Sequence, residues 1–167
     1  MVPVEQKDLY QAQAPCLYPN RMIIQELSSP AQPRFCTISY EPAADCVVVT
    51  WEGSLGADEA KQGAQKTLEV LRELRPSCVL NDNSRVMVMW FETLHWIEQH
   101  WAPIATTYGL RHMAHVTHPD TYHIIMEIAM QHNFSPYFDL QLFDDVAQAQ
   151  DWLQHCRELD ATTLPRR

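Results

Sequence analysis

From Phe35 onward, short apolar segments alternate with segments of helical periodicity, and this alternation constrains the fold more than any other feature. The strand-like segments are residues 35–40, 46–51, 78–80, 112–116 and 137–143. The helix-like segments are residues 57–75, 90–108, 121–131 and 146–158. Such alternation is typical of an α/β fold in which the later strands are parallel and the helices pack on the sheet.

The first two strands form an exception to this alternation. Only a short turn containing Pro42 separates residues 35–40 from residues 46–51, which predicts an antiparallel hairpin. We therefore predict a mixed sheet of about five strands. We predict a single domain at residues 35–158. A Pro-containing N-terminal arm at 1–34, which could include one edge strand at 21–26, precedes it, and a C-terminal tail at 159–167 follows it.

Prolines and acidic residues give more local expectations for the helices. Pro76 should end the first helix, and Pro103 should kink or split the second. Asp120 is placed to cap the third helix, and the pair Asp144-Asp145 to cap the last.

Charge and hydropathy exclude several classes of protein. The net charge is −9, from 12 basic and 21 acidic residues, and a surface of that sign repels phosphate backbones, so no nucleic-acid partner is expected. No apolar stretch reaches the roughly 20 residues that span a bilayer. The N-terminus does not resemble a secretory signal, and a cytoplasmic location is expected.

Motifs that would carry catalysis or bind a cofactor are missing. The chain has only 4 glycines, with neither a glycine-rich phosphate loop nor Gly-x-Ser-x-Gly, and its 5 cysteines include no Cys-x-x-Cys. His112 and His115 should point to opposite faces of one strand, so we interpret the run from His112 to His123 as surface and loop histidines rather than a metal site. The prediction is a protein that is not an enzyme and has no cofactor.

The polar tetrad Asp82-Asn83-Ser84-Arg85 is the candidate site. It follows a strand that looks buried and precedes a helix, which predicts a turn at the carboxyl edge of the sheet, where α/β proteins bind ligands. Its side chains can form local turn hydrogen bonds, and Arg85 can pair with Asp82 or with an anion. The competing interpretation is a purely structural turn closed by an Asp82–Arg85 bridge.

Two aromatic residues join the candidate site from the helix that follows. Trp90 and Trp101 fit its apolar stripe, whereas Phe91 and Trp96 lie off it. Apolar residues on both faces of this helix indicate either a covered pocket or contact with a partner subunit, with core packing as the alternative.

Several of these motifs together resemble the bacterial STAS-like family, which is related in fold to anti-sigma-factor antagonists of the SpoIIAA type and to CRAL-TRIO lipid-binding domains. The resemblance runs from Phe35 to Leu153. It rests on Trp51-Glu52-Gly53, Leu80-x-Asp82-Asn83 with Arg85, Trp96, Trp101-x-Pro103, the strand His112–Val116, Phe143-Asp144-Asp145 and Trp152-Leu153.

The resemblance implies a sheet with packed helices and a non-enzymatic protein. In the antagonists, a partner kinase phosphorylates a serine at a strand-to-helix turn, and Ser84 stands near that position. The usual Asp-Ser-Ser-Gly pattern is replaced here by Asp82-Asn83-Ser84-Arg85. A phosphate on Ser84 could pair with Arg85.

Two functional hypotheses stay open. The first is a regulatory protein-interaction module whose contact surface is the 82–85 turn and the Trp90–Trp101 helix; this hypothesis predicts an exposed, shallow surface. The second is a binder of a small apolar or anionic ligand, with a deep pocket under that helix rimmed by Asp82 and Arg85. Self-association is compatible with both.

Overall fold

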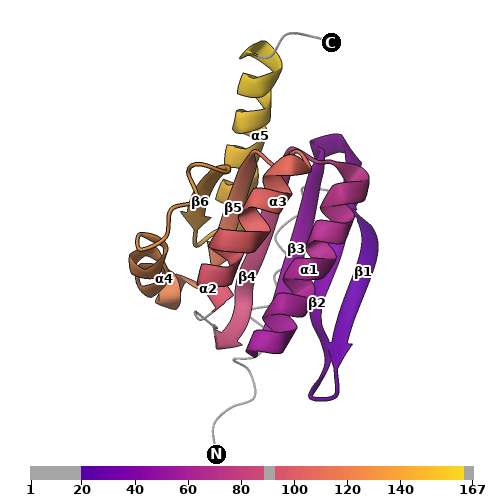
Figure 1. Ribbon diagram of the computed structural model, residues 1–167, viewed down its shortest axis with the longest axis vertical. Helices are drawn as coiled ribbons and strands as arrows, with labels where there is room; N and C mark the ends of the chain where they lie inside the picture. The colour runs from indigo at the N-terminus through magenta and orange to yellow at the C-terminus, as the bar shows by residue number, and fades with distance from the viewer. Residues whose placement is uncertain (1–19, 89–92, 164–167) are drawn as a thin grey trace, which may run out of the picture.

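A six-stranded mixed sheet forms the centre of the molecule (Figure 1). The computed structural model describes residues 20–88 and 93–163. The strands lie side by side in chain order, β1 Met22–Ser29, β2 Gln32–Glu41, β3 Cys46–Ser54, β4 Cys78–Val88, β5 His112–Thr117 and β6 Asp139–Phe143. The first three strands are antiparallel, and β3 to β6 are parallel.

This architecture confirms the mixed α/β sheet with its opening hairpin. The sheet has six strands rather than about five, because β1, which lies within the stretch assigned to the N-terminal arm, pairs with β2 as the edge strand.

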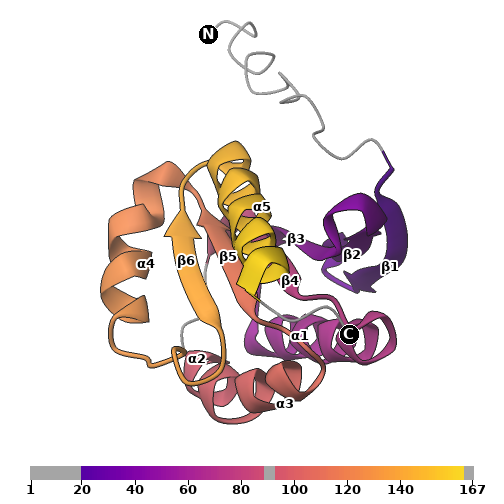
Figure 2. The ribbon, with the colours of Figure 1, turned by 90° about the horizontal axis from the view of Figure 1, so that it is seen from above.

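Helices cover both faces of the sheet. They are α1 Ala57–Leu74, α2 Thr93–Trp96, the π-helical turn Ile97–Trp101, α3 Ala102–Thr107, α4 Tyr122–Ala129 and α5 Val146–Thr163. Seen from above, α1, α2 and α3 lie on one face, α5 lies on the other, and α4 lies beside β6 (Figure 2). α5 continues to Thr163, so the predicted tail at 159–167 begins within this helix.

Two apolar layers follow from the alternation of side chains along the central strands. Val47 and Val49 of β3 pack toward α1, while Val48 between them packs toward α5. β3 is buried on both faces, as its nearly continuous apolar sequence indicates.

Pro103 produces a π-helical turn where a kink or split was predicted. The N–H of Ala102 bonds to the carbonyl of Ile97, five residues earlier. Proline has no N–H to donate, and in an α-helix its ring collides with the carbonyl four residues earlier. Widening the preceding turn removes that collision, and the helix continues from Thr93 to Thr107.

β4 is longer than the sequence indicated, and this corrects the position of the tetrad. Residues 82–85 were predicted to form a strand-to-helix turn, but they lie inside the strand. The register passes from Thr50↔Asp82 to Glu52↔Arg85, so β4 carries one extra residue there, a β-bulge. β3 extends to Ser54 and supplies ladder partners for these polar residues, which explains why the strand does not end at Leu80.

The predicted helix caps are partly correct. Asp145 caps α5, because its Oδ1 accepts a hydrogen bond from the Gln148 N–H at 2.9 Å. Asp120 does not cap α4. His118 Nδ1 instead accepts from the Asp120 N–H at 3.2 Å, at the start of the 3₁₀ turn Pro119–Thr121.

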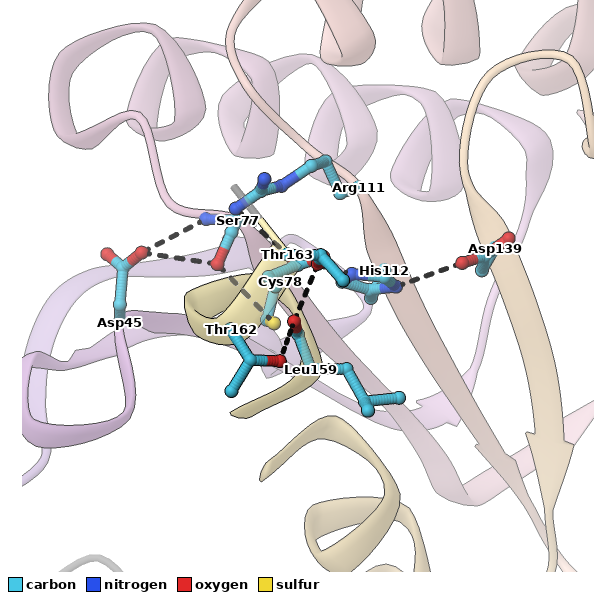
Figure 3. Close-up of polar contacts among 10 residues, drawn as sticks. Asp45, Ser77, Cys78, Arg111, His112, Asp139, Leu159, Thr162 and Thr163 are labelled. Carbon is cyan, nitrogen blue, oxygen red and sulfur yellow. Dashed lines mark hydrogen bonds and ion pairs between the residues drawn. The ribbon is translucent and has the colours of Figure 1, made fainter. Parts of the chain in front are cut away.

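Polar contacts fix the end of the sheet at which the parallel strands begin (Figure 3). Asp45 Oδ2 accepts from the backbone N–H of Ser77 at 3.2 Å and from its hydroxyl at 3.3 Å. His112 Nδ1 lies 3.2 Å from Asp139, and its Nε2 lies 2.9 Å from Asp160 of α5. These contacts join the starts of β4, β5 and β6 to their neighbours.

Candidate functional site

A cavity of about 180 Å³ lies between the sheet and the helices α1, α2 and α4. Its floor is formed by the parallel strands β3 to β6 and reaches from Val79 and Met113 near their starts to Asn83 and Val86 toward the carboxyl edge, where open α/β sheets bind ligands. The lining is mostly apolar, and its apolar side chains include Val49, Leu55, Val79, Leu94, Ile97, Trp101, Met113, Ile125, Ile128, Phe134, Phe138, Leu140 and Leu142. The polar lining residues are Thr67, Asn81, Asn83, Thr93 and His115.

Close packing of Trp51 against α1 shapes one wall of the cavity. A Cβ atom at Gly63 would collide with the Trp51 indole, so only glycine allows the helix to approach the strand this closely. The indole is buried between β3 and α1, and its edge faces the cavity floor.

A hydrogen-bond relay crosses the floor from β3 to β5. The indole Nε1–H of Trp51 donates to Asn81 Oδ1 at 2.8 Å, and Asn81 Nδ2 lies 2.9 Å from His115 Nδ1. Asn81 and His115 are register partners on neighbouring parallel strands, which explains why their side chains meet. The relay holds three polar side chains in fixed orientations within an apolar environment.

Burial controls the charge of His115. It lowers the pKa of the imidazole to about 4, although the negative charge of Asp82 acts in the opposite direction. The ring is therefore neutral near pH 7.

Two buried nitrogen atoms of the cavity lining have no hydrogen-bond partner among the described residues, Asn83 Nδ2 and His115 Nε2. Asn83 is 7% exposed. Because an unpaired buried polar group costs about 1–3 kcal/mol, such groups in a native protein usually meet a further partner.

The loop that follows α4 closes one side of the cavity. Glu98 of the π-helical turn accepts a hydrogen bond from His132 Nδ1 at 2.7 Å and another from the Asn133 N–H at 3.1 Å. These bonds hold the pKa of Glu98 below its ordinary value, with the bond from His132 as the larger cause. The same loop contributes the stacked rings of Phe134 and Phe138, 5.9 Å apart, to the lining.

The predicted site residues are not brought together at one place. Asn83 is the only member of the tetrad that lines the cavity. Asp82 Oδ1 accepts from the Ser84 N–H at 3.0 Å, a local bond of the expected kind. Arg85 pairs with Glu52 at 3.2 Å rather than with Asp82, because the bulge places it opposite Glu52 on β3.

The aromatic candidates do not line the cavity in the described part of the chain. Trp96 is half-buried, packs on the apolar core and stacks on His100 with ring centroids 6.3 Å apart. Phe91 lies outside the described residues. Other side chains of the same helix, namely Thr93, Leu94, Ile97 and Trp101, form the lining.

The histidines and cysteines form no metal site in the described ranges 20–88 and 93–163, where no group of three or more possible protein ligands converges. His112 and His115 point to opposite faces, as predicted, but His115 lines the cavity and is not the surface histidine that we expected. Burial raises the pKa of the Cys78 thiol to about 11, which suits a packing role. Within the described residues, no helix is both long and apolar enough to cross a membrane.

Sequence reasoning missed the relay formed by Trp51, Asn81 and His115. A usable indication was present, since Asn81 directly follows the predicted strand 78–80 and His115 lies inside the predicted strand 112–116, and both strands were expected to be parallel. Their pairing depends on the register between β4 and β5, which neither segment specifies by itself.

Comparison with known proteins gives one structural likeness. No family model and no curated protein matches the chain. A solved structure from Shewanella loihica PV-4 is similar at 16% identity, with a TM-score of 0.45, over 80% of this chain and 93% of that one. It is described as an uncharacterised protein of the DUF3478 family with a SpoIIAA-like fold. The relation to CRAL-TRIO domains stays a prediction.

Proposed function

We propose that the protein binds a small, largely apolar molecule in the cavity beneath the helix Thr93–Thr107. The observation that carries this proposal is the cavity itself, which is apolar over most of its lining and has the polar side chains Asn81, Asn83 and His115 on its floor. Binding pockets for small molecules commonly combine an apolar wall with a few fixed polar groups.

The size of the cavity limits the ligand. An engineered apolar cavity of about 150 Å³ in another protein holds a benzene molecule. The cavity here, at about 180 Å³, fits a ligand somewhat larger than benzene.

The lining supports binding rather than catalysis. Among the described lining residues, His115 is the only histidine, burial keeps its ring neutral near pH 7, and no carboxylate, amine or thiol accompanies it. General acid–base catalysis is most effective when the pKa of the acting group lies near the operating pH, and the pKa of His115, at about 4, lies well below it. The proposal is therefore that the ligand is held and not transformed.

The regulatory interaction module is a second candidate function, favoured by one observation outside the cavity. Met87, at the end of β4, is 81% exposed, and the Arg85 side chain near it is 68% exposed. An exposed methionine beside a charged residue suits a contact between proteins. If a second copy is the partner, sedimentation velocity will show a dimer for the native chain and a monomer for Met87→Asp; identical profiles would contradict self-association through Met87.

Ligand binding can be tested with cumene as an apolar probe of suitable size. Ligand-detected NMR should show cumene bound to the full chain, and the probe should raise the thermal midpoint of unfolding. Ala60→Phe places a ring into the cavity from α1 and should abolish binding. Gln62→Phe, on the exposed side of the same helix, is the matched control and should bind normally. Equal binding by both variants, or none by the native protein, would contradict the proposal.

A further inference from the structure

The two donors in the cavity indicate what chemistry a ligand must carry. Asn83 and His115 come from adjacent strands, β4 and β5, and both side chains line the same cavity. Asn83 Nδ2 and His115 Nε2 are buried and have no hydrogen-bond partner in the described part of the chain. Asn81 lies between Trp51 and His115 in the relay, and both of its amide atoms are already engaged.

The relay decides which of these atoms carry hydrogen. An indole nitrogen can only donate, so the atom of Asn81 that faces Trp51 is the carbonyl oxygen. The NH₂ group of Asn81 therefore faces His115 and donates to Nδ1. A neutral imidazole that accepts at Nδ1 carries its proton on Nε2. Through Asn81, Trp51 thus fixes Nε2 as the protonated nitrogen of His115, a residue of the cavity lining.

The charges around the cavity determine whether the acceptor of the ligand can be an anion or must be neutral. The described lining residues include no lysine and no arginine, and His115 is neutral near pH 7. A carboxylate in such a cavity would be a buried charge without a counter-ion, which is strongly unfavourable. A neutral carbonyl oxygen accepts the same hydrogen bonds without that cost.

Resting on the proposed function, we infer that the ligand carries a neutral carbonyl-type oxygen, held at the floor by the Nε2–H of His115 with the Asn83 amide as a second donor. Its apolar part lies against the side chains of α2, α4 and the π-helical turn. A pure hydrocarbon would leave both donors without a hydrogen-bond partner. The cost of these unpaired donors discriminates against the hydrocarbon more strongly than the shape of the cavity alone.

Three probes of similar size test this inference on the full chain. Acetophenone supplies a neutral carbonyl, cumene replaces it by an isopropyl group, and benzoate replaces it by an anion. Acetophenone should bind at least about threefold more tightly than cumene, the equivalent of one net hydrogen bond. Benzoate should bind most weakly. Dissociation constants come from ligand-detected NMR titrations.

Two variants test whether Asn83 contributes to the preference for acetophenone over cumene. Asn83→Leu keeps a similar side-chain volume but removes a donor, and it should reduce the preference for acetophenone over cumene. Ser84→Ala, at the neighbouring position outside the cavity lining, is the matched control and should leave the preference unchanged. A measurement on the native chain does not depend on any variant folding: acetophenone should shift the ¹⁵N and ¹H resonances of the His115 Nε2–H group, and cumene should leave them nearly in place.

Each outcome is informative. Equal affinity for acetophenone and cumene, with no response at His115, would mean that the donors hold only water, and it would overturn the inference while leaving an apolar binding protein. If benzoate binds more tightly than acetophenone, the preferred ligand is an anion rather than a neutral acceptor, and the inference is also overturned. Binding of none of the three probes would contradict the proposed function itself.

Discussion

Asn81 and His115 face each other across β4 and β5, with Asn81 Nδ2 2.9 Å from His115 Nδ1. This contact joins two strands inside an apolar layer and sets the tautomer of the histidine. Because the same imidazole faces the cavity, its protonation state links the stability of the sheet to the chemistry of the site.

Protonation of His115 should destabilise the fold in acid. Burial lowers its pKa from 6.5 to about 4. As the pH falls below 6.5, the unfolded chain binds this proton before the folded chain does. The free energy of unfolding should therefore decrease by up to ~1.4 kcal/mol per pH unit down to about pH 4. Urea denaturation of the native protein and of His115→Gln at several pH values isolates this contribution, and parallel curves would contradict it.

Asn81→Asp should reverse the donor pattern of the relay. A carboxylate can still accept from the Trp51 indole, but it cannot donate to His115 Nδ1. The negative charge should raise the pKa of His115 and favour the doubly protonated ring. A ¹⁵N NMR titration of the histidine measures the change, with Ser84→Asp as a control outside the cavity lining. A His115 pKa that stays at about 4 in Asn81→Asp would show that the relay does not control the ring.

Gly63→Ala should destabilise the protein by about 1–3 kcal/mol, because the added methyl group collides with the Trp51 indole. The neighbouring exposed substitution Gln62→Ala should change stability by less than about 0.5 kcal/mol. Denaturant unfolding compares the two variants. In the double variant Gly63→Ala with Trp51→Phe, the loss in free energy of unfolding should be smaller than the sum of the losses in the two single variants, since the smaller ring relieves the collision. Strict additivity of the two losses would argue against this collision.

Glu98→Ala should loosen the loop that follows α4. The carboxylate accepts bonds from His132 and from the backbone of Asn133, and both are lost in the variant. Amide hydrogen exchange should accelerate at Asn133 and Phe134, and apolar probes should exchange faster with the cavity. Gln99→Ala, an exposed neighbour, is the control and should leave both rates unchanged.

The pH dependence of that loop has a defined direction. The pKa of Glu98 is lowered in the folded protein, so its stabilising contribution is present above its ordinary pKa and is lost as the pH falls below it. The protection factor of the Asn133 amide, which corrects the exchange rate for its intrinsic pH dependence, should therefore fall in acid in the native protein, and in Glu98→Ala this fall should be smaller. The same pH response in both proteins would assign it to another group.

Periodicity predicted the elements of the fold well where side chains repeat over a long segment. The first helix, its end before Pro76 and the hairpin of β2 and β3 are all confirmed. Prediction failed where a polar segment continued a strand: residues 82–85 resemble a turn in isolation, but β3 supplies a partner ladder for them. The composition of residues 82–85 gives no information on how far the neighbouring strand β3 extends.

By itself, the sequence determined the mixed α/β class and the order of helices and strands, because these follow from local periodicity and turn chemistry. It also predicted a candidate site just beyond the strand at residues 78–80. Only the tertiary structure decided which residues form that site. Asn81 and His115 meet through strand register, and Trp51 reaches them because Gly63 admits its ring. Such contacts join residues far apart along the chain, and their geometry arises only when sheet and helices pack together.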